Sequence, residues 1–290
     1  MGPLRIIDGH NVSLISARKI ETVLAVLLIR SDLVVSRDQL TTEIWGDRPP
    51  RRATDGLHVY ISQLRKFLHH SDRPESPVVT QYPGYLLRKG SDEIDLHIFI
   101  DLVSQGRSLA RQQLHEQAIE RFEQALRLWR GLLLGDLRGG PIIDGFGTWL
   151  LESRLECLEL LAESNLLLGR HRELIGRLYS LTSENPLREA FHRQLMLALY
   201  RSERQADALM AYQIARNTLR EELGLEPGRP LQNLHRAILA ADTRLETMSA
   251  STCEVAPAGS GRRIRSRNLS GSKVGCTFEL GQRARRGRSR

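Results

Sequence analysis

Residues 51–70, RRATDGLHVYISQLRKFLHH, gather seven Arg, Lys and His residues within twenty positions. The apolar residues of this stretch recur at helical spacing and so predict a helix with one buried face: Leu57, Ile61, Leu64 and Leu68. The side chains that project away from this face are polar or basic: His58, Ser62, Arg65 and Lys66. A basic helical face of this kind is either solvated or binds phosphate, and spacing alone allows both interpretations.

The elements around this stretch must decide its role. Two hairpin signals, LRIIDGHNVSLIS around Asp8-Gly9 and PVVTQYPGYLLRK around Pro83-Gly84, flank three helical segments. The first helix lies in ARKIETVLAVLLIRS. The second lies in VVSRDQLTTEIWG, where Ser36 and Gln39 match a capping box. The third is residues 51–70, with Thr54 or Asp55 as its cap. This order predicts a winged helix-turn-helix over residues 1–90, with the third helix on the surface beside a hairpin.

Two stretches carry a family resemblance. The segment VVSRDQLTTEIWGDRPPRRATDGLHVYISQLRKFL, followed by VTQYPGYLL, resembles the OmpR/PhoB-type DNA-binding domain. WGDRPP and VYISQLRKFL are similar to the variant found in the Streptomyces antibiotic regulatory proteins. The resemblance implies that the third helix enters the major groove and presents four side chains to bases: His58, Ser62, Gln63 and Lys66. It places Arg65 at a base or at a nearby phosphate. Lys and Arg can pair with guanine, and Gln can pair with adenine.

Other residues are expected at the DNA backbone. Ser36 and Arg37 stand at a helix N-terminus, where free backbone N–H groups and the helix dipole favour a phosphate, although Ser36 also caps the helix. Arg51 and Arg52 lie in the turn before the third helix. In the wing, Gln81 stands where relatives often carry Arg. Tyr82 is open between a backbone contact and core packing, whereas Tyr85 is expected in the core.

The second part of the chain, residues 94–240, has purely helical periodicity. Three segments have Ala, Leu or aromatic residues at the same spacing of i, i+4 and i+7: Ala118, Phe122 and Ala125; Leu174, Leu178 and Leu181; Ala208, Tyr212 and Ala215. The step from Leu178 to Tyr212 is 34 residues, the tetratricopeptide (TPR) period. The longer step from Phe122 fits an insertion of about 22 residues in the Gly-rich stretch RGLLLGDLRGGPIIDGFG. These features predict TPR-like helical repeats, and the region resembles the bacterial transcriptional activator domain.

The net charge also differs between the regions of the chain. Residues 1–90 carry +4, residues 91–240 carry −3 and residues 241–290 carry +7. The last region is rich in Ser, Gly and Arg without apolar periodicity, so it is expected to be a disordered basic tail. The expected fold class is therefore mainly α: a winged helix with short β-hairpins, an all-α repeat domain and this tail.

Composition narrows the function classes. No apolar run approaches the ~18 residues of a membrane span, and no apolar signal sequence follows Met1, so we expect a cytoplasmic protein without a membrane partner. The three cysteines are far apart and form neither a metal-ligand pattern nor a disulfide framework. No recognisable catalytic or phosphate-cradling motif is present, so we expect no enzyme activity, no cofactor and no metal.

These observations favour a sequence-specific transcriptional activator. The resemblance implies binding to direct repeats in double-stranded promoter DNA, self-association on that DNA, and recruitment of RNA polymerase, through its sigma factor, to an antibiotic or other secondary-metabolite gene cluster. The alternative is a TPR-type peptide-binding scaffold whose winged helix docks a protein partner. A phosphorelay response regulator is disfavoured because no receiver domain precedes the winged helix in this sequence.

Overall fold

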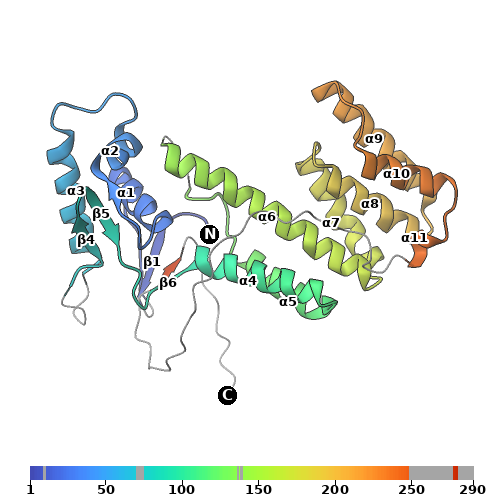
Figure 1. Ribbon diagram of the computed structural model, residues 1–290, viewed down its shortest axis with the longest axis horizontal. Helices are drawn as coiled ribbons and strands as arrows, with labels where there is room; N and C mark the ends of the chain where they lie inside the picture. The colour runs from blue at the N-terminus through green and yellow to red at the C-terminus, as the bar shows by residue number, and fades with distance from the viewer. Residues whose placement is uncertain (9–10, 70–74, 136, 138–139, 248–276, 280–290) are drawn as a thin grey trace, which may run out of the picture. The chain divides into compact units, whose positions relative to one another are not determined.

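The computed structural model describes residues 1–8, 11–69, 75–135, 137, 140–247 and 277–279. The chain divides into two compact units. Unit 1 comprises residues 1–102, 124–154 and 268–290, and unit 2 comprises residues 103–123 and 155–267. The described residues are mainly helical, and the short strands among them belong to unit 1 (Figure 1). Among the described residues, no helix combines the length and apolar character that crossing a membrane requires.

The N-terminal part of unit 1 is a winged helix, as the sequence predicts. Its elements follow in the order β1 (Arg5–Asp8), β2 (Asn11–Ser13), α1 (Arg18–Ile29), β3 (Val35–Ser36), α2 (Arg37–Trp45), α3 (Ala53–Phe67), β4 (Val78–Gln81) and β5 (Gly84–Leu87). α1 forms the centre of the core, since every residue from Thr22 to Leu28 is buried. α2 and α3 both pack against α1 (Figure 1), and β5 lies between β3 and β4 in an antiparallel sheet.

The helix boundaries agree with local sequence signals at α2 but not at α3. The capping box at α2 is confirmed: the Gln39 amide donates to Ser36 Oγ over 3.1 Å, and the Ser36 amide donates to Gln39 Oε1 over 3.0 Å. Gly46 ends this helix. α3 instead begins at Ala53, after Arg52, and no side chain caps it. The expected cap at Thr54 or Asp55 is therefore wrong, because both residues already lie inside the first helical turn.

The region after residue 241 differs from the expected disorder at two short elements. α11 spans Arg244–Thr247, and β7 spans Thr277–Glu279. β7 pairs antiparallel with β1 and parallel with β6 (Glu93–Ile94), so the order of this sheet is β2-β1-β7-β6. Its backbone hydrogen bonds to two neighbours explain the strand, which the tail's polar composition could not indicate. Residues 248–276 and 280–290 lie outside the described residues, and disorder there stays a prediction.

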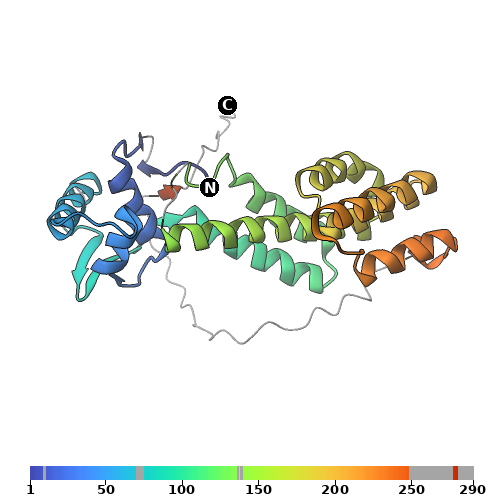
Figure 2. The ribbon, with the colours of Figure 1, turned by 90° about the horizontal axis from the view of Figure 1, so that it is seen from above.

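The remaining helices build the repeats. They are α4 (Asp95–Arg111), α5 (His115–Arg127), α6 (Pro141–Leu167), α7 (His171–Glu184), α8 (Glu189–Arg201), α9 (Gln205–Leu223) and α10 (Arg229–Leu239). All nine residues at the repeat offsets are buried, which confirms them as the core positions of α5, α7 and α9. In unit 2, α8 packs against α7, α9 and α10 (Figure 2). Part of the Gly-rich stretch that is expected to hold the insertion is helical, because α6 begins at Pro141 and contains Gly145 and Gly147.

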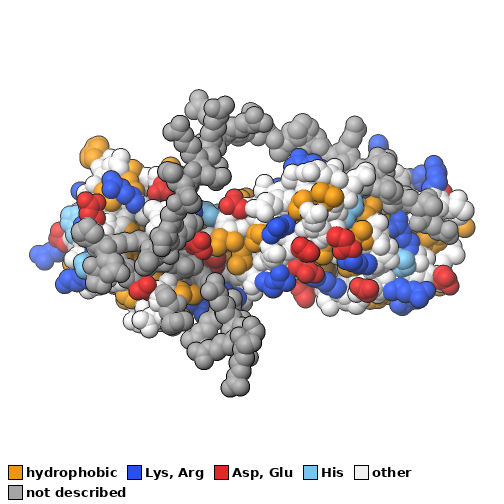
Figure 3. Space-filling model, turned by 90° about the horizontal axis from the view of Figure 1, so that it is seen from below, with side chains coloured by type: hydrophobic (Ala, Val, Ile, Leu, Met, Phe, Trp, Pro, Cys, Tyr) orange, Lys and Arg blue, Asp and Glu red, His pale blue; other side chains and the backbone are white. Residues whose placement is uncertain are grey.

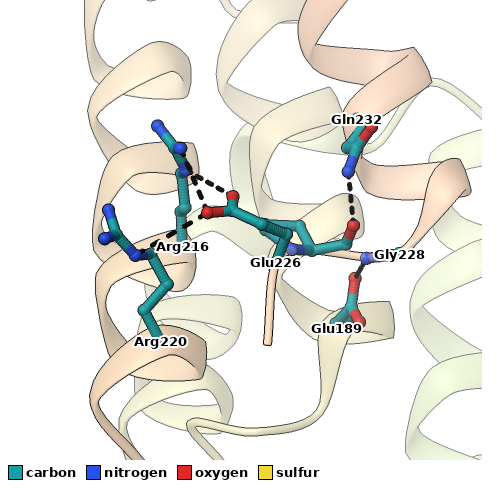
Figure 4. A network of polar contacts seen from close by, with 7 residues as sticks. Glu189, Arg216, Arg220, Glu226, Gly228 and Gln232 are labelled. Atoms are coloured by element: carbon teal, nitrogen blue, oxygen red, sulfur yellow. Dashed lines mark hydrogen bonds and ion pairs between the residues drawn. The ribbon is translucent and has the colours of Figure 1, made fainter. Parts of the chain in front are cut away.

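Side chains of α8, α9 and α10 hold the connection from α9 to α10 (Figure 4). Gly224 ends α9 in the left-handed conformation, with φ of 68°. Glu226 then accepts a 2.6 Å hydrogen bond from Arg216 Nε, and Glu189 Oε2 accepts a 2.8 Å hydrogen bond from the Gly228 amide. The Arg216–Glu226 pair is exposed and contributes little to stability. The partly buried bonds, from the Gly228 amide to Glu189 and from Gln232 Nε2 to the Pro227 carbonyl over 2.7 Å, therefore anchor the start of α10.

Acidic and basic side chains are mixed over the face of unit 2 that Figure 3 shows. The ion pairs of this unit include Arg107–Glu156, Arg188–Glu159 and Arg204–Asp207. This mixture agrees with the small net charge of residues 91–240 and contrasts with the basic excess of the winged helix.

Two glycines of unit 2 should respond in opposite ways to a single methyl group. A Cβ on Gly176, inside α7, would meet no atom within 4 Å, so Gly176→Ala should raise the free energy of unfolding by about 0.5–1 kcal/mol. A Cβ on Gly106 would lie 2.4 Å from the Phe122 ring, so Gly106→Ala should lower it by about 1–3 kcal/mol. Urea unfolding measures both changes, and equal changes in the two variants would contradict this packing.

Candidate nucleic-acid interface

α3 presents a polar face opposite its buried one. Leu57, Ile61 and Leu64 are buried against the winged-helix core. The side chains predicted from the sequence to face the bases are all exposed: His58, Ser62, Gln63 and Lys66. An exposed polar face on the third helix of a winged helix can enter the major groove, which admits an α-helix. The structure therefore brings these four residues together on one accessible surface.

Arg65 takes a different place from the one expected. This half-buried side chain turns toward the wing, where Nε donates to the Val78 carbonyl over 3.0 Å and Nη2 donates to Thr80 Oγ1 over 2.7 Å. Both acceptors belong to β4. In this geometry Arg65 holds the wing against α3 and does not extend from the polar face. The structure therefore does not favour a base contact by Arg65, and its contact with a nearby phosphate stays a prediction.

Sequence reasoning missed Val59. This residue lies between the predicted base-facing residues on α3, and 51% of it is exposed. It lies one helical turn before Gln63 and two turns before Lys66, opposite the buried face. An exposed aliphatic side chain in this position can contact a thymine methyl group. Helical spacing alone places Val59 on this face, whereas its apolar side chain distinguishes it from the polar residues predicted there.

The start of α2 and the tip of the wing lie close together. The Arg37 amide donates to the Pro83 carbonyl over 3.4 Å, so the first turn of α2 contacts the wing turn. The Arg37 side chain is exposed, and Tyr82 at the wing tip is 95% exposed. Ser36 Oγ accepts the capping bond from Gln39, so a phosphate contact by Ser36 would use its hydroxyl hydrogen. This arrangement gathers potential phosphate contacts from two elements.

The wing itself is tightly built around Gly84. Gln81 pairs with Gly84, and Thr80 pairs with Tyr85, which is buried as expected. Gly84 also pairs with Ser36 of β3. A Cβ on Gly84 would lie 1.8 Å from the Val35 carbonyl oxygen, so only glycine allows this approach of β5 to β3. Gln81 is exposed near the tip, where an amide can donate to a backbone phosphate.

Arg51 and Arg52 complete the surface. Both are exposed in the turn that leads into α3. Guanidinium groups in this position can form charge-assisted hydrogen bonds with phosphate oxygens, which carry affinity but no sequence information. The winged helix thus separates a polar face on α3, able to read bases, from flanking groups able to contact the backbone.

This fold and this surface define a transcriptional regulator with an OmpR/PhoB-type winged helix. Residues 13–87 match the family "Transcriptional regulatory protein, C terminal", and residues 94–239 match the "Bacterial transcriptional activator domain". The chain belongs to the Streptomyces antibiotic regulatory protein family of transcriptional activators.

Individual relatives agree with this assignment. The chain is 37% identical to the regulatory protein DnrI of Streptomyces peucetius over 254 residues, which covers 85% of this chain and 93% of DnrI. It is 37% identical to the transcriptional regulator RedD of Streptomyces coelicolor, with 86% of this chain and 72% of RedD covered. The structure of Mycobacterium tuberculosis EmbR in complex with a low-affinity phosphopeptide matches with a TM-score of 0.79 and 34% identity, covering 85% of this chain and 66% of that one.

Proposed function

We propose that this chain is a cytoplasmic, sequence-specific activator of an antibiotic or other secondary-metabolite gene cluster. α3 enters the major groove of promoter DNA, and the groups around it contact the backbone on either side. The observation that carries the proposal is the exposed polar face of α3, flanked by a wing that Arg65 holds in place.

The base contacts follow from side-chain chemistry. Lys66 can donate to guanine O6 or N7, and the Gln63 amide can pair with adenine N6 and N7. His58 and Ser62 supply further donors or acceptors, and Val59 packs against a thymine methyl group. The backbone contacts are made by Ser36, Arg37, Arg51, Arg52, Gln81 and Tyr82.

Family membership supports the arrangement on promoters. Protomers bind short direct repeats spaced by about one helical turn, roughly 10–11 base pairs, so neighbours lie head to tail on one face of the duplex. The helical repeats provide the self-association and recruit RNA polymerase through its sigma factor. The protein acts by binding and carries out no chemistry of its own.

Selection of bound duplexes from a random pool by the full chain tests this function. We expect enrichment of two copies of one motif in the same orientation, separated by about one helical turn. A peptide-binding scaffold would enrich no duplex, and that outcome would reject the proposal. The selected duplex, in a transcription reaction with RNA polymerase, then tests whether binding activates.

A further inference from the structure

Glu43 is a buried carboxylate on α2, close to the helix end opposite Ser36 and Arg37. Only 5% of the residue is exposed. A buried carboxylate is costly unless hydrogen bonds replace its lost hydration. Burial raises the pKa of Glu43, and hydrogen bonds from two backbone amides oppose that rise. The two amides that offset the desolvation of Glu43 therefore determine what this carboxylate does.

Both amides belong to the first turn of α6. The Ile142 amide donates to Glu43 Oε1 over 2.6 Å, and the Ile143 amide donates to Glu43 Oε2 over 3.3 Å. Since α6 begins at Pro141, these are the second and third residues of the helix. Their N–H groups normally donate hydrogen bonds to the side chain of an N-cap residue. The residue before the helix is Gly140, which has no side chain. Glu43 therefore caps α6 from another helix.

Gly140 makes this approach possible. A Cβ on Gly140 would lie 2.0 Å from Glu43 Oε2 and 2.8 Å from Glu43 Cα. The second distance involves the backbone of α2, so a side chain at residue 140 would push the two helices apart even if the carboxylate moved aside.

The contact joins the two family domains within unit 1. α2 lies in the residues that match the regulatory C-terminal family, and α6 lies in those that match the activator-domain family. Glu43 is seven residues, about two helical turns, from Ser36. One short helix therefore carries potential phosphate contacts at its first turn and the cap of α6 near its last.

We propose that Glu43 is a positioning residue that couples DNA binding on α2 to the first turn of α6. This inference rests on the proposed DNA binding. DNA that holds α2 in place holds the Glu43 carboxylate in place as well, and so stabilises the two capped amides of α6. The activator domain thus responds to DNA binding through the cap of α6.

Hydrogen exchange on the full chain tests the cap without DNA. In Glu43→Ala the Ile142 and Ile143 amides should exchange about five- to tenfold faster, the factor that corresponds to a lost N-cap. Glu43→Gln should fall between wild type and Glu43→Ala, because its amide offers one acceptor oxygen. Gly140→Ala should also speed exchange, since it separates the helices. Amides of α3 report that the winged helix remains folded.

Asp144→Asn is the matched control. Asp144 is an exposed carboxylate in the same first turn of α6; its charge raises the pKa of Glu43, but it takes no part in the two hydrogen bonds to Glu43. It should change exchange at Ile142 and Ile143 less than twofold. Unchanged exchange in both Glu43→Ala and Gly140→Ala, with α3 intact, would overturn the cap.

A second arm adds the selected duplex. In the wild type, DNA should slow exchange of the Ile142 and Ile143 amides severalfold, and this slowing should be lost in Glu43→Ala while α3 is still protected by DNA. If α3 is protected but α6 is not, the coupling is wrong and the DNA-binding proposal stands. If no duplex protects α3, the proposed function itself fails, and the coupling to DNA fails with it.

Discussion

Gly84→Ala should unfold the wing and abolish specific DNA binding. The added methyl group would meet the Val35 carbonyl oxygen at 1.8 Å and Ser36 Cα at 2.8 Å, and both belong to the backbone of β3. No side-chain rotation can relieve such a contact, so β5 must leave β3. We expect the free energy of unfolding to fall by about 3 kcal/mol, at the upper end of overpacking effects. Urea unfolding and binding to the selected duplex measure the two losses.

Gly56→Ala is the control for this prediction. Gly56 lies inside α3, and a Cβ there would meet the nearest atom, in the Trp45 ring, at 3.4 Å, an ordinary contact. Alanine is the better helix former by about 1 kcal/mol, so this variant should be as stable as the wild type or more stable. Similar losses in the two variants would show that the approach of β5 to β3 is not the cause.

Lys66→Ala and Gln63→Ala should each reduce sequence preference by about 5- to 150-fold, which corresponds to about 1–3 kcal/mol for a lost base contact. Both residues are exposed on the polar face of α3 and contribute nothing to its buried face. Fluorescence anisotropy with the selected duplex and a scrambled duplex gives the ratio of affinities. Only the affinity for the selected duplex should fall strongly.

Two further variants separate base recognition from phosphate contact and from folding stability. Arg51→Ala should weaken both duplexes about equally, because a phosphate contact carries no sequence information. Ile61→Ala removes a buried side chain, so it should lower the free energy of unfolding by about 2–5 kcal/mol. An unchanged affinity ratio in both Lys66→Ala and Gln63→Ala would reject α3 as the reading helix.

The features that could be predicted from the sequence are local or periodic. Ser36 and Gln39 are three residues apart, and their capping box is present. The core positions of α5, α7 and α9 follow from their offsets, and Phe122, Leu178 and Tyr212 are all buried. In both cases the residues that interact lie on one helix or repeat at a fixed interval, so spacing alone identifies them.

The features that could not be predicted depend on distant partners. In the sequence Arg65 is a cation on a helix with no evident partner. Its acceptor, the Val78 carbonyl, lies on β4 and comes next to Arg65 only in the folded protein. Glu43 and Ile142 are 99 residues apart, and no local pattern joins them. Gly145 and Gly147 lie in the Gly-rich stretch expected to hold the insertion, yet both are inside α6, so the weak helix propensity of glycine does not end this helix.

The hydrogen bonds of Arg65 to β4 have a calorimetric consequence. A recognition element that orders only on binding adds a large negative heat-capacity change and an entropic penalty to association. Here the wing is already joined to α3 through the Val78 carbonyl and Thr80 Oγ1. Association of the winged helix with a duplex should therefore show the modest heat-capacity change of rigid docking. We then expect the release of condensed counterions from the phosphates to supply the main favourable entropy of this association.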